Sequence, residues 1–187
     1  RFLFAFLFLF VSIGYAVFGA TVKHHGITSL ANNASWDIHF SNVKILEQSD
    51  TVSAQTPTIT GDSNNRIEYD VDLNSRGDVF EFSADIENTG TIDGVIETIS
   101  SSISVDNGEP TDEIPDYLDY YVQYLDGTSV TNNRYLLSGE KDTIIVHLGL
   151  KDNLSDEKFK SIQGKTIDLG LDVDYTQKDI KEIENDS

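Results

Sequence analysis

The chain has 187 residues, with 13 basic and 32 acidic side chains, and it contains neither Cys nor Met. A formal charge of −19 argues against nucleic acid as a partner, because phosphates repel an acidic surface. The lack of Cys excludes disulfides, thiolate metal sites and thiol nucleophiles. This length suits one domain with an appendage, and the sequence predicts four parts, which are residues 1–20, 21–34, 35–176 and 177–187.

The first part is an uncharged apolar run. Six of the ten Phe lie within the first 18 residues, and no charged side chain occurs between Arg1 and Lys23. A helix of this length measures roughly 28 Å, close to the ~30 Å hydrocarbon core of a bilayer. We therefore expect residues 1–20 to form a hydrophobic helix. It is either a signal peptide with small residues at Gly14-Tyr15-Ala16 or a retained anchor or filament-core helix, and both place the acidic remainder outside the cytoplasm.

Residues 21–34 connect this run to the first strand and contain too few apolar side chains for a core strand. Such a segment is suited to pairing with an exposed sheet edge of another subunit. The alternative is a stem without regular structure, and the sequence favours neither. The side chains that we expect to make an assembly contact are Phe2, Phe6, Phe10, Val22, Ile27 and Leu30.

From residue 35 onward the hydrophobic period changes to two, as half-buried antiparallel strands require. The clearest alternation occurs at residues 36–40, 67–73, 80–86 and 167–175. Weaker strands are predicted at residues 95–105, 118–125, 135–137 and 143–150. Their common phase predicts one core, made of Trp36, Phe40, Tyr69, Val71, Phe80, Phe82, Leu169, Leu171 and Val173.

One helix and one long loop interrupt the strands. Ser155 precedes acidic and then basic residues, and Gly164 follows them, so a short helix is predicted near 155–163. Residues 49–65 are rich in Ser, Thr, Asn and Gln and predict a long exposed loop. Residues 177–187 form a charged tail, either a frayed helix or a linker. The whole pattern predicts a mostly β protein, an antiparallel sandwich of the jelly-roll type.

Motifs for catalysis are absent from the sequence. There is no His-Glu-x-x-His pattern, no Gly-x-Ser-x-Gly elbow and no Gly-rich phosphate loop. We therefore expect a protein that is not an enzyme and that needs no cofactor. The four histidines are expected to have structural or surface roles, and they are His24, His25, His39 and His147.

Carboxylates are the one dense functional group. Asp168, Asp172 and Asp174 lie on one predicted strand and could offer oxygen ligands to calcium, as in the weak sites of extracellular modules. The EF-hand pattern is missing, however. The alternative is that alternating Asp side chains solvate the outer face of the strand and oppose edge-to-edge aggregation.

A turn, a Phe-rich strand and a second turn follow one another between Leu73 and Gly94. The first turn contains Gly77 and Asp78, and the second contains Asn88 and Gly90. This stretch resembles the TasA/camelysin family of exported bacterial surface proteins, and the resemblance extends over roughly residues 10–105. One departure from the family pattern is Arg76, which stands where the family usually has Pro.

The resemblance implies a jelly-roll subunit that a dedicated signal peptidase exports and that joins its neighbours through an N-terminal segment. The expected function is therefore a structural subunit of an extracellular fibre, pilus-like filament or surface matrix of a bacterium. Self-association is expected, with contact to the membrane through residues 2–20 if they are retained. The alternative is a membrane-tethered binding or adhesion module, whose ligand would contact Tyr117, Tyr120, Tyr121 and Tyr124.

Overall fold

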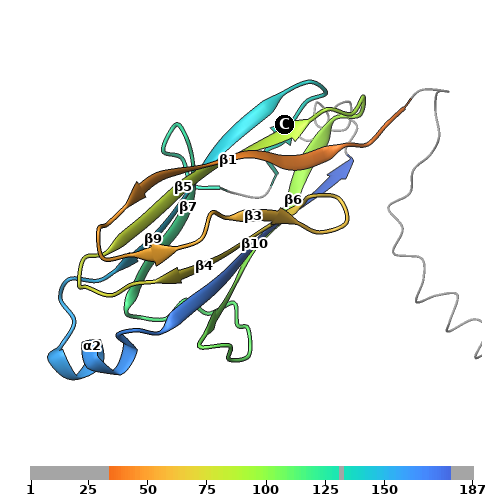
Figure 1. Ribbon diagram of the computed structural model, residues 1–187. Coiled ribbons are helices and arrows are strands. Elements are labelled where there is room, and N and C mark those ends of the chain that lie inside the picture. Colours follow the sequence, from red (N-terminus) through yellow and green to blue (C-terminus); the bar gives the residue numbers. More distant parts are fainter. Residues whose placement is uncertain (1–33, 131–132, 178–187) are drawn as a thin grey trace, which may run out of the picture. The chain divides into compact units, whose positions relative to one another are not determined.

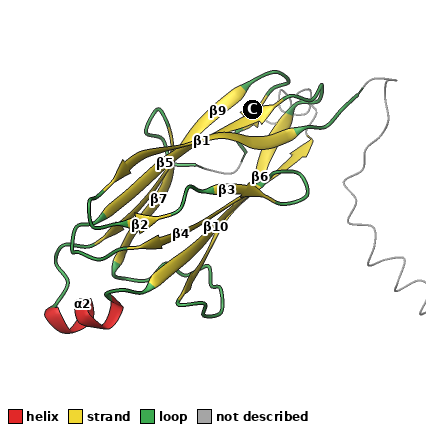
Figure 2. Cartoon of the chain, viewed as in Figure 1, coloured by secondary structure: helices red, strands yellow, loops and turns green. Residues whose placement is uncertain are grey.

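The structure is a computed structural model that describes residues 34–130 and 133–177. Within these ranges the chain is mostly β, with antiparallel strands and one short helix, α2 (Asp156–Ile162) (Figure 1, Figure 2). No helix in the described ranges has the length and apolar character needed to span a bilayer. The hydrophobic helix, the assembly segment and nearly all of the charged tail that the sequence predicts lie outside the described residues.

The first sheet has four strands. Its spatial order is β1 (Ile38–Gln48), β5 (Val79–Asn88), β9 (Lys141–Leu150) and β7 (Leu118–Tyr124). All neighbours in this sheet are antiparallel, and β1 and β7 are its edge strands.

The second sheet has six strands. Its main order is β2 (Ser53–Ala54), β4 (Arg66–Asp72), β10 (Thr166–Gln177), β6 (Gly94–Val105) and β8 (Tyr135–Leu136). The sixth strand, β3 (Thr58–Thr60), also pairs with β4. The last strand of the described residues, β10, therefore occupies the centre of this sheet, between β4 and β6.

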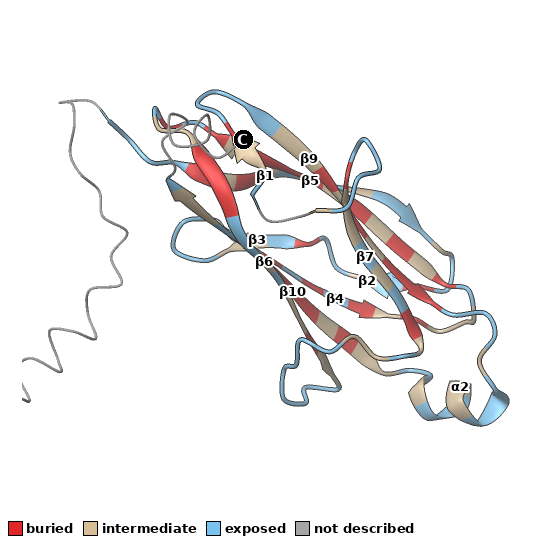
Figure 3. Cartoon of the chain, turned by 180° about the vertical axis from the view of Figure 1, so that it is seen from behind, coloured by how far each residue is buried: buried red, intermediate tan, exposed pale blue. Residues whose placement is uncertain are grey.

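One buried cluster contains side chains from both sheets. In its middle the ring of Tyr69 from β4 meets the ring of Phe82 from β5 edge to face, with 4.9 Å between centroids. Buried positions alternate with more exposed ones along the strands, as Figure 3 shows. Every side chain predicted for the core belongs to this cluster except Trp36. The prediction for Trp36 is wrong, because this residue precedes β1 and is 38% exposed, with its ring beside Gly94.

The other local predictions have mixed outcomes. The helix prediction is confirmed, since Ser155 caps α2 by accepting a hydrogen bond from the Lys158 N–H (3.2 Å). The predicted exposed loop at 49–65 is partly wrong, because it contains β2, β3 and the buried Val52.

The first strand also extends to Gln48, well beyond the predicted residues 36–40. A bulge explains this difference. Asn42 has a positive φ of 50°, and the register shifts between Ser41 and Lys44. The bulge changes which face the following side chains occupy, so the period of two does not continue in phase.

Candidate functional site

The turn before β5 is organised around a buried carboxylate. Asp78 is 3% exposed and accepts hydrogen bonds from the backbone N–H groups of Asn74 (2.7 Å) and Ser75 (2.8 Å). The hydroxyl of Thr51 donates to the other carboxylate oxygen. Gly77 has a φ of +76°, a left-handed conformation that favours glycine. Gly77 and Asp78 therefore fix the geometry of the turn.

The other end of β5 is held by a buried amide. The Asn88 side chain donates to the carbonyl oxygens of Ile92 (2.9 Å) and Leu136 (3.0 Å) and accepts from the Gly90 N–H (3.1 Å). A Cβ atom at Gly90 would lie 2.5 Å from the carbonyl oxygen of Ser35, so only glycine fits there. The residues that carry the family resemblance therefore lie at opposite ends of β5 and do not form a common site. They are Gly77 and Asp78 at one end and Asn88 and Gly90 at the other.

The three aspartates predicted to bind calcium all lie on β10. Asp172 forms an ion pair with Arg66, and Asp168 accepts a hydrogen bond from the hydroxyl of Ser104 (2.9 Å). Positions four residues apart on a strand are separated by about 13 Å, so Asp168 and Asp172 are too distant to share one ion. Residues 34–130 and 133–177 contain no group of three or more acidic or His side chains placed to hold a metal. Calcium binding stays a prediction.

A hollow of about 300 Å³ lies on the outer face of the six-stranded sheet. Asp70 of β4 and Asp168 of β10 stand directly opposite each other in its wall. Burial, together with the negative charge of Asp168, raises the pKa of Asp70 above its ordinary value of 3.8. Ionising both carboxyls therefore costs free energy in the folded state.

We expect Asp70→Asn to raise the melting temperature at pH 7. Because the pKa of Asp70 is raised in the folded state, its stabilising contribution is present below pH 3.8 and is lost as the pH rises through the folded-state pKa. The gain from the substitution should therefore disappear at low pH. Calorimetry at both pH values measures it, with the exposed Asp62→Asn as control. A melting temperature at pH 7 that is equal to or below that of the wild type would contradict the expectation.

The four tyrosines proposed as a ligand platform do not share one surface. Tyr124 belongs to the core cluster and Tyr120 packs against it. Tyr121 is on the outer face, where its ring stacks on His147 at 4.5 Å and 4° between planes. Tyr117 lies under the ammonium group of Lys158, which is 4.9 Å from the ring centroid. These side chains therefore do not form the concave aromatic site that a binding module would use.

The edge of β6 is paired at both ends but not in its middle. At one end β8 pairs with Gly94 and Val95, and the Ile96 N–H donates to the Arg134 carbonyl oxygen (2.9 Å). At the other end Ile103 exchanges two backbone hydrogen bonds with Thr111 (2.8 and 2.9 Å). Both contacts lie on the side of β6 that faces away from β10.

Within residues 34–130 and 133–177, the backbone groups between these contacts have no hydrogen-bond partner on that side. In an antiparallel ladder every second residue directs its N–H and C=O to the same side, so Ile99 and Ser101 point the same way as Ile103. No backbone hydrogen bond to these outward groups is formed within the described part of the chain. Among the described residues, no strand pairs with this side of β6 over residues 97–102.

The four-stranded sheet ends on the same side of the domain. Its edge strand β7 lies opposite β6. The hydroxyl of Ser101 on β6 and that of Tyr120 on β7 are 2.8 Å apart, which links the two sheets at this edge. Sequence reasoning missed this surface, since residues 95–105 merely predict a weak strand. The unpaired edge depends on partners far away in the sequence. We take it as the candidate functional site.

Comparison with known proteins adds no relationship: no protein-family model, no curated protein and no solved structure matches this chain.

Proposed function

We propose that this chain is a structural subunit of an extracellular fibre, pilus-like filament or cell-surface matrix, and that it assembles through residues 1–34. The observation that carries the proposal is the incomplete edge of β6 in an otherwise well-packed domain. An unpaired edge is a template for a strand of another chain. The apolar run of residues 2–20 supports self-association as well, because lipid or neighbouring copies must cover it.

We infer that the two sheets form an antiparallel β-sandwich of the jelly-roll type. The shared core cluster and the contact between Tyr69 and Phe82 support this arrangement. A sandwich of this kind is not a closed barrel, so each of its sheets keeps edge strands. Such edges are the natural contact surfaces of a fibre subunit.

In this proposal the domain works outside a bacterial cell. Residues 2–20 direct its export and are then either removed or kept as the anchor or core of the filament. The formal charge of −19 keeps finished domains from clumping nonspecifically, so association is confined to the N-terminal contact.

A chain that begins at Ser35 tests the proposal. We expect it to fold as a soluble monomer, whereas the full chain forms filaments or attaches to membranes. Electron microscopy, light scattering and co-sedimentation with liposomes distinguish these states. Filaments formed by the shortened chain would place the contact outside residues 1–34. A full chain that attaches to liposomes but never self-associates would favour the membrane-tethered binding or adhesion module.

A further inference from the structure

We infer that α2 is a hinged lid over one end of the two sheets, and that it opens while the rest of the domain stays folded. The lid consists of residues 154–163, and Gly164 is its hinge. Charged contacts that salt weakens hold the lid closed, and opening uncovers the apolar end of the core. The inference goes beyond the proposed function and does not depend on it.

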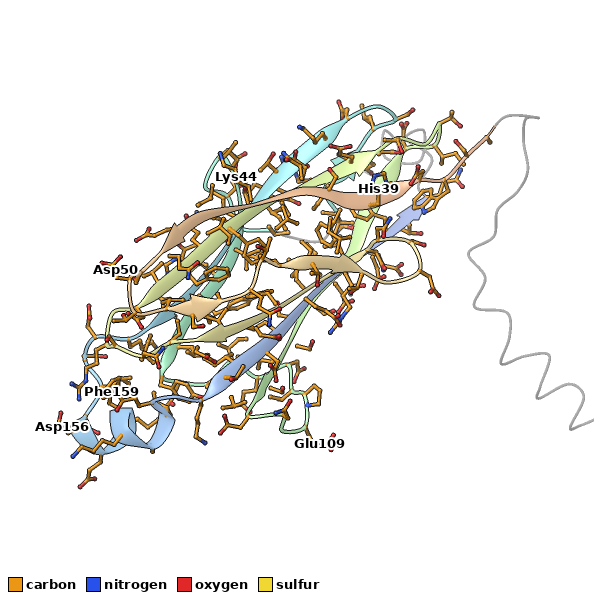
Figure 4. All side chains as sticks on the ribbon, in the orientation of Figure 1. His39, Lys44, Asp50, Glu109, Asp156 and Phe159 are labelled. Carbon is orange, nitrogen blue, oxygen red and sulfur yellow. The ribbon has the colours of Figure 1, made fainter. Side chains whose placement is uncertain are left out.

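The lid is docked without complete burial of any of its side chains. Every residue of α2, which lies wholly within the described ranges, is at least partly exposed. Leu154, Phe159 and Ile162 are partly buried where they pack against the core, and Figure 4 shows Phe159 beside the end of the strands. A helix of seven residues is not stable by itself in water, so α2 keeps its structure only while it is docked.

Arg76 is the main contact that holds the lid closed. Its guanidinium group lies 4.6 Å from the centroid of the Phe159 ring and donates to the Leu154 carbonyl oxygen (3.1 Å) and the Asp156 carboxylate (2.6 Å). Arg76 belongs to the turn that the buried Asp78 organises, so the lid is attached to a fixed point. Proline, the usual residue of the TasA/camelysin pattern here, could make none of these side-chain contacts. The family resemblance therefore does not imply this lid.

Two lysines connect the lid and its hinge to other turns. The ammonium group of Lys158 is 3.3 Å from the Asp116 carboxylate and 4.9 Å from the centroid of the Tyr117 ring. Lys165, beside the hinge, is 3.4 Å from the Asp106 carboxylate. Asp116 is 87% exposed, and solvent and salt screen such ion pairs. Several weak contacts therefore hold the lid, and a rise in ionic strength weakens them together.

An apolar crevice lies under the lid. It measures about 10 Å³ and lies between Ile162 of α2 and the strands, where Leu73, Leu150 and Ile167 line it. These three side chains are at most 4% exposed while the lid is closed. Gly164 has a φ of +76°, and a Cβ atom there would meet no described atom within 4 Å, so the backbone has room to turn. Opening exposes the crevice and leaves the hydrogen bonds of both sheets intact.

A cysteine under the lid measures its opening. Because the chain has no Cys, Ile167→Cys and Ala84→Cys each give a unique thiol, one beneath α2 and one at a fully buried position of β5. Each is treated with an aromatic disulfide reagent, and its rate is divided by the rate in urea. We expect position 167 to react at least about tenfold faster than position 84, and about 1 M NaCl to increase this ratio. Equal rates would overturn the inference, and a ratio that salt leaves unchanged would refute the charged contacts.

Arg76→Ala tests the contact that holds the lid, with Arg134→Ala as the matched control. Arg134 also pairs with a carboxylate, that of Asp142, and also lies over a ring, that of Tyr124. Relative to the rate at position 84, we expect Arg76→Ala to raise the labelling rate at position 167 about tenfold and Arg134→Ala to change it less than about threefold. Equal effects of the two substitutions would refute Arg76 as the contact that closes the lid.

Hydrogen exchange of the wild-type chain tests the lid without a substitution in the core. The amides of Phe159 and Gln163 donate hydrogen bonds within the lid, and the amide of Val146 lies in β9, which is paired on both sides. We expect the two lid amides to exchange at rates that low urea concentrations do not change, because local opening exposes little surface. The Val146 amide is expected to exchange faster as urea is added. The same urea dependence for all three amides would show that α2 opens only when the domain unfolds, which overturns the inference.

Discussion

Replacing Phe82 with Ala is expected to destabilise the domain by about 3–5 kcal/mol, a large part of the roughly 5–15 kcal/mol that stabilises a typical domain. Phe82 is fully buried, and its ring contacts Tyr69 at 4.9 Å and Phe80 at 6.1 Å between centroids. Its neighbours across the sheet are Ile45 and Val146. Because β5 is held by β1 on one side and by β9 on the other, the surroundings cannot collapse fully into the space left by the ring.

Urea unfolding followed by circular dichroism measures this loss. The control is Leu125→Ala, since Leu125 is the most exposed of the large hydrophobic side chains in the described ranges, at 68%. We expect the control to change the free energy of unfolding by less than about 0.5 kcal/mol. A Phe82→Ala protein as stable as the control would disprove the assignment of Phe82 to the centre of the core.

Replacing Asp78 with Ala is expected to lower the free energy of unfolding by about 2–4 kcal/mol. The substitution leaves the Asn74 and Ser75 N–H groups and the Thr51 hydroxyl without their acceptor. Hydrogen bonds to a charged acceptor are stronger than neutral ones, and donors left unpaired in a buried turn retain their desolvation cost. The turn links β4 to β5, so its loss also weakens the connection between the two sheets.

The matched control is Asp119→Ala, which removes an exposed carboxylate from β7. Thermal unfolding of both variants separates the effect of the turn from the effect of reduced negative charge. If Asp78→Ala melts at the same temperature as Asp119→Ala, the hydrogen bonds of the turn do not contribute to stability.

The sequence predicts the strands that carry a local signal. Residues 67–73, 80–86 and 167–175 alternate strictly, and apart from Leu73, which directly follows β4, they lie in strands whose apolar face enters the core. The helix after Ser155 is equally local, because its cap and its charges are contained in a few residues. These elements need no information from distant parts of the chain.

Other elements depend on distant partners and escape prediction. β3 has only three residues, Thr58–Thr60, and it is a strand because it pairs with β4. The bulge at Asn42 shifts the phase of β1, and no alternation reveals the strand beyond it.

The candidate site is the clearest case of a feature that local sequence patterns cannot predict. Among the described residues, the free side of β6 at 97–102 lies between the contacts that β6 makes with β8 and with Thr111, and on its other side β6 pairs with β10. Which strand lies beside which is set by packing across the whole domain.

The central position of β10 makes completion of the six-stranded sheet a late step in folding. Residues 166–177 pair with β4 on one side and with β6 on the other, so β4 and β6 each lack one neighbouring strand until these residues are present. During synthesis the six-stranded sheet consequently cannot be completed until residues 166–177 have left the ribosome, because long-range pairing cannot precede its partner. A chain that threads N-terminus first through a narrow channel is in the same position. Its six-stranded sheet cannot be completed until β10 has passed through the channel, and the domain can fold only after that.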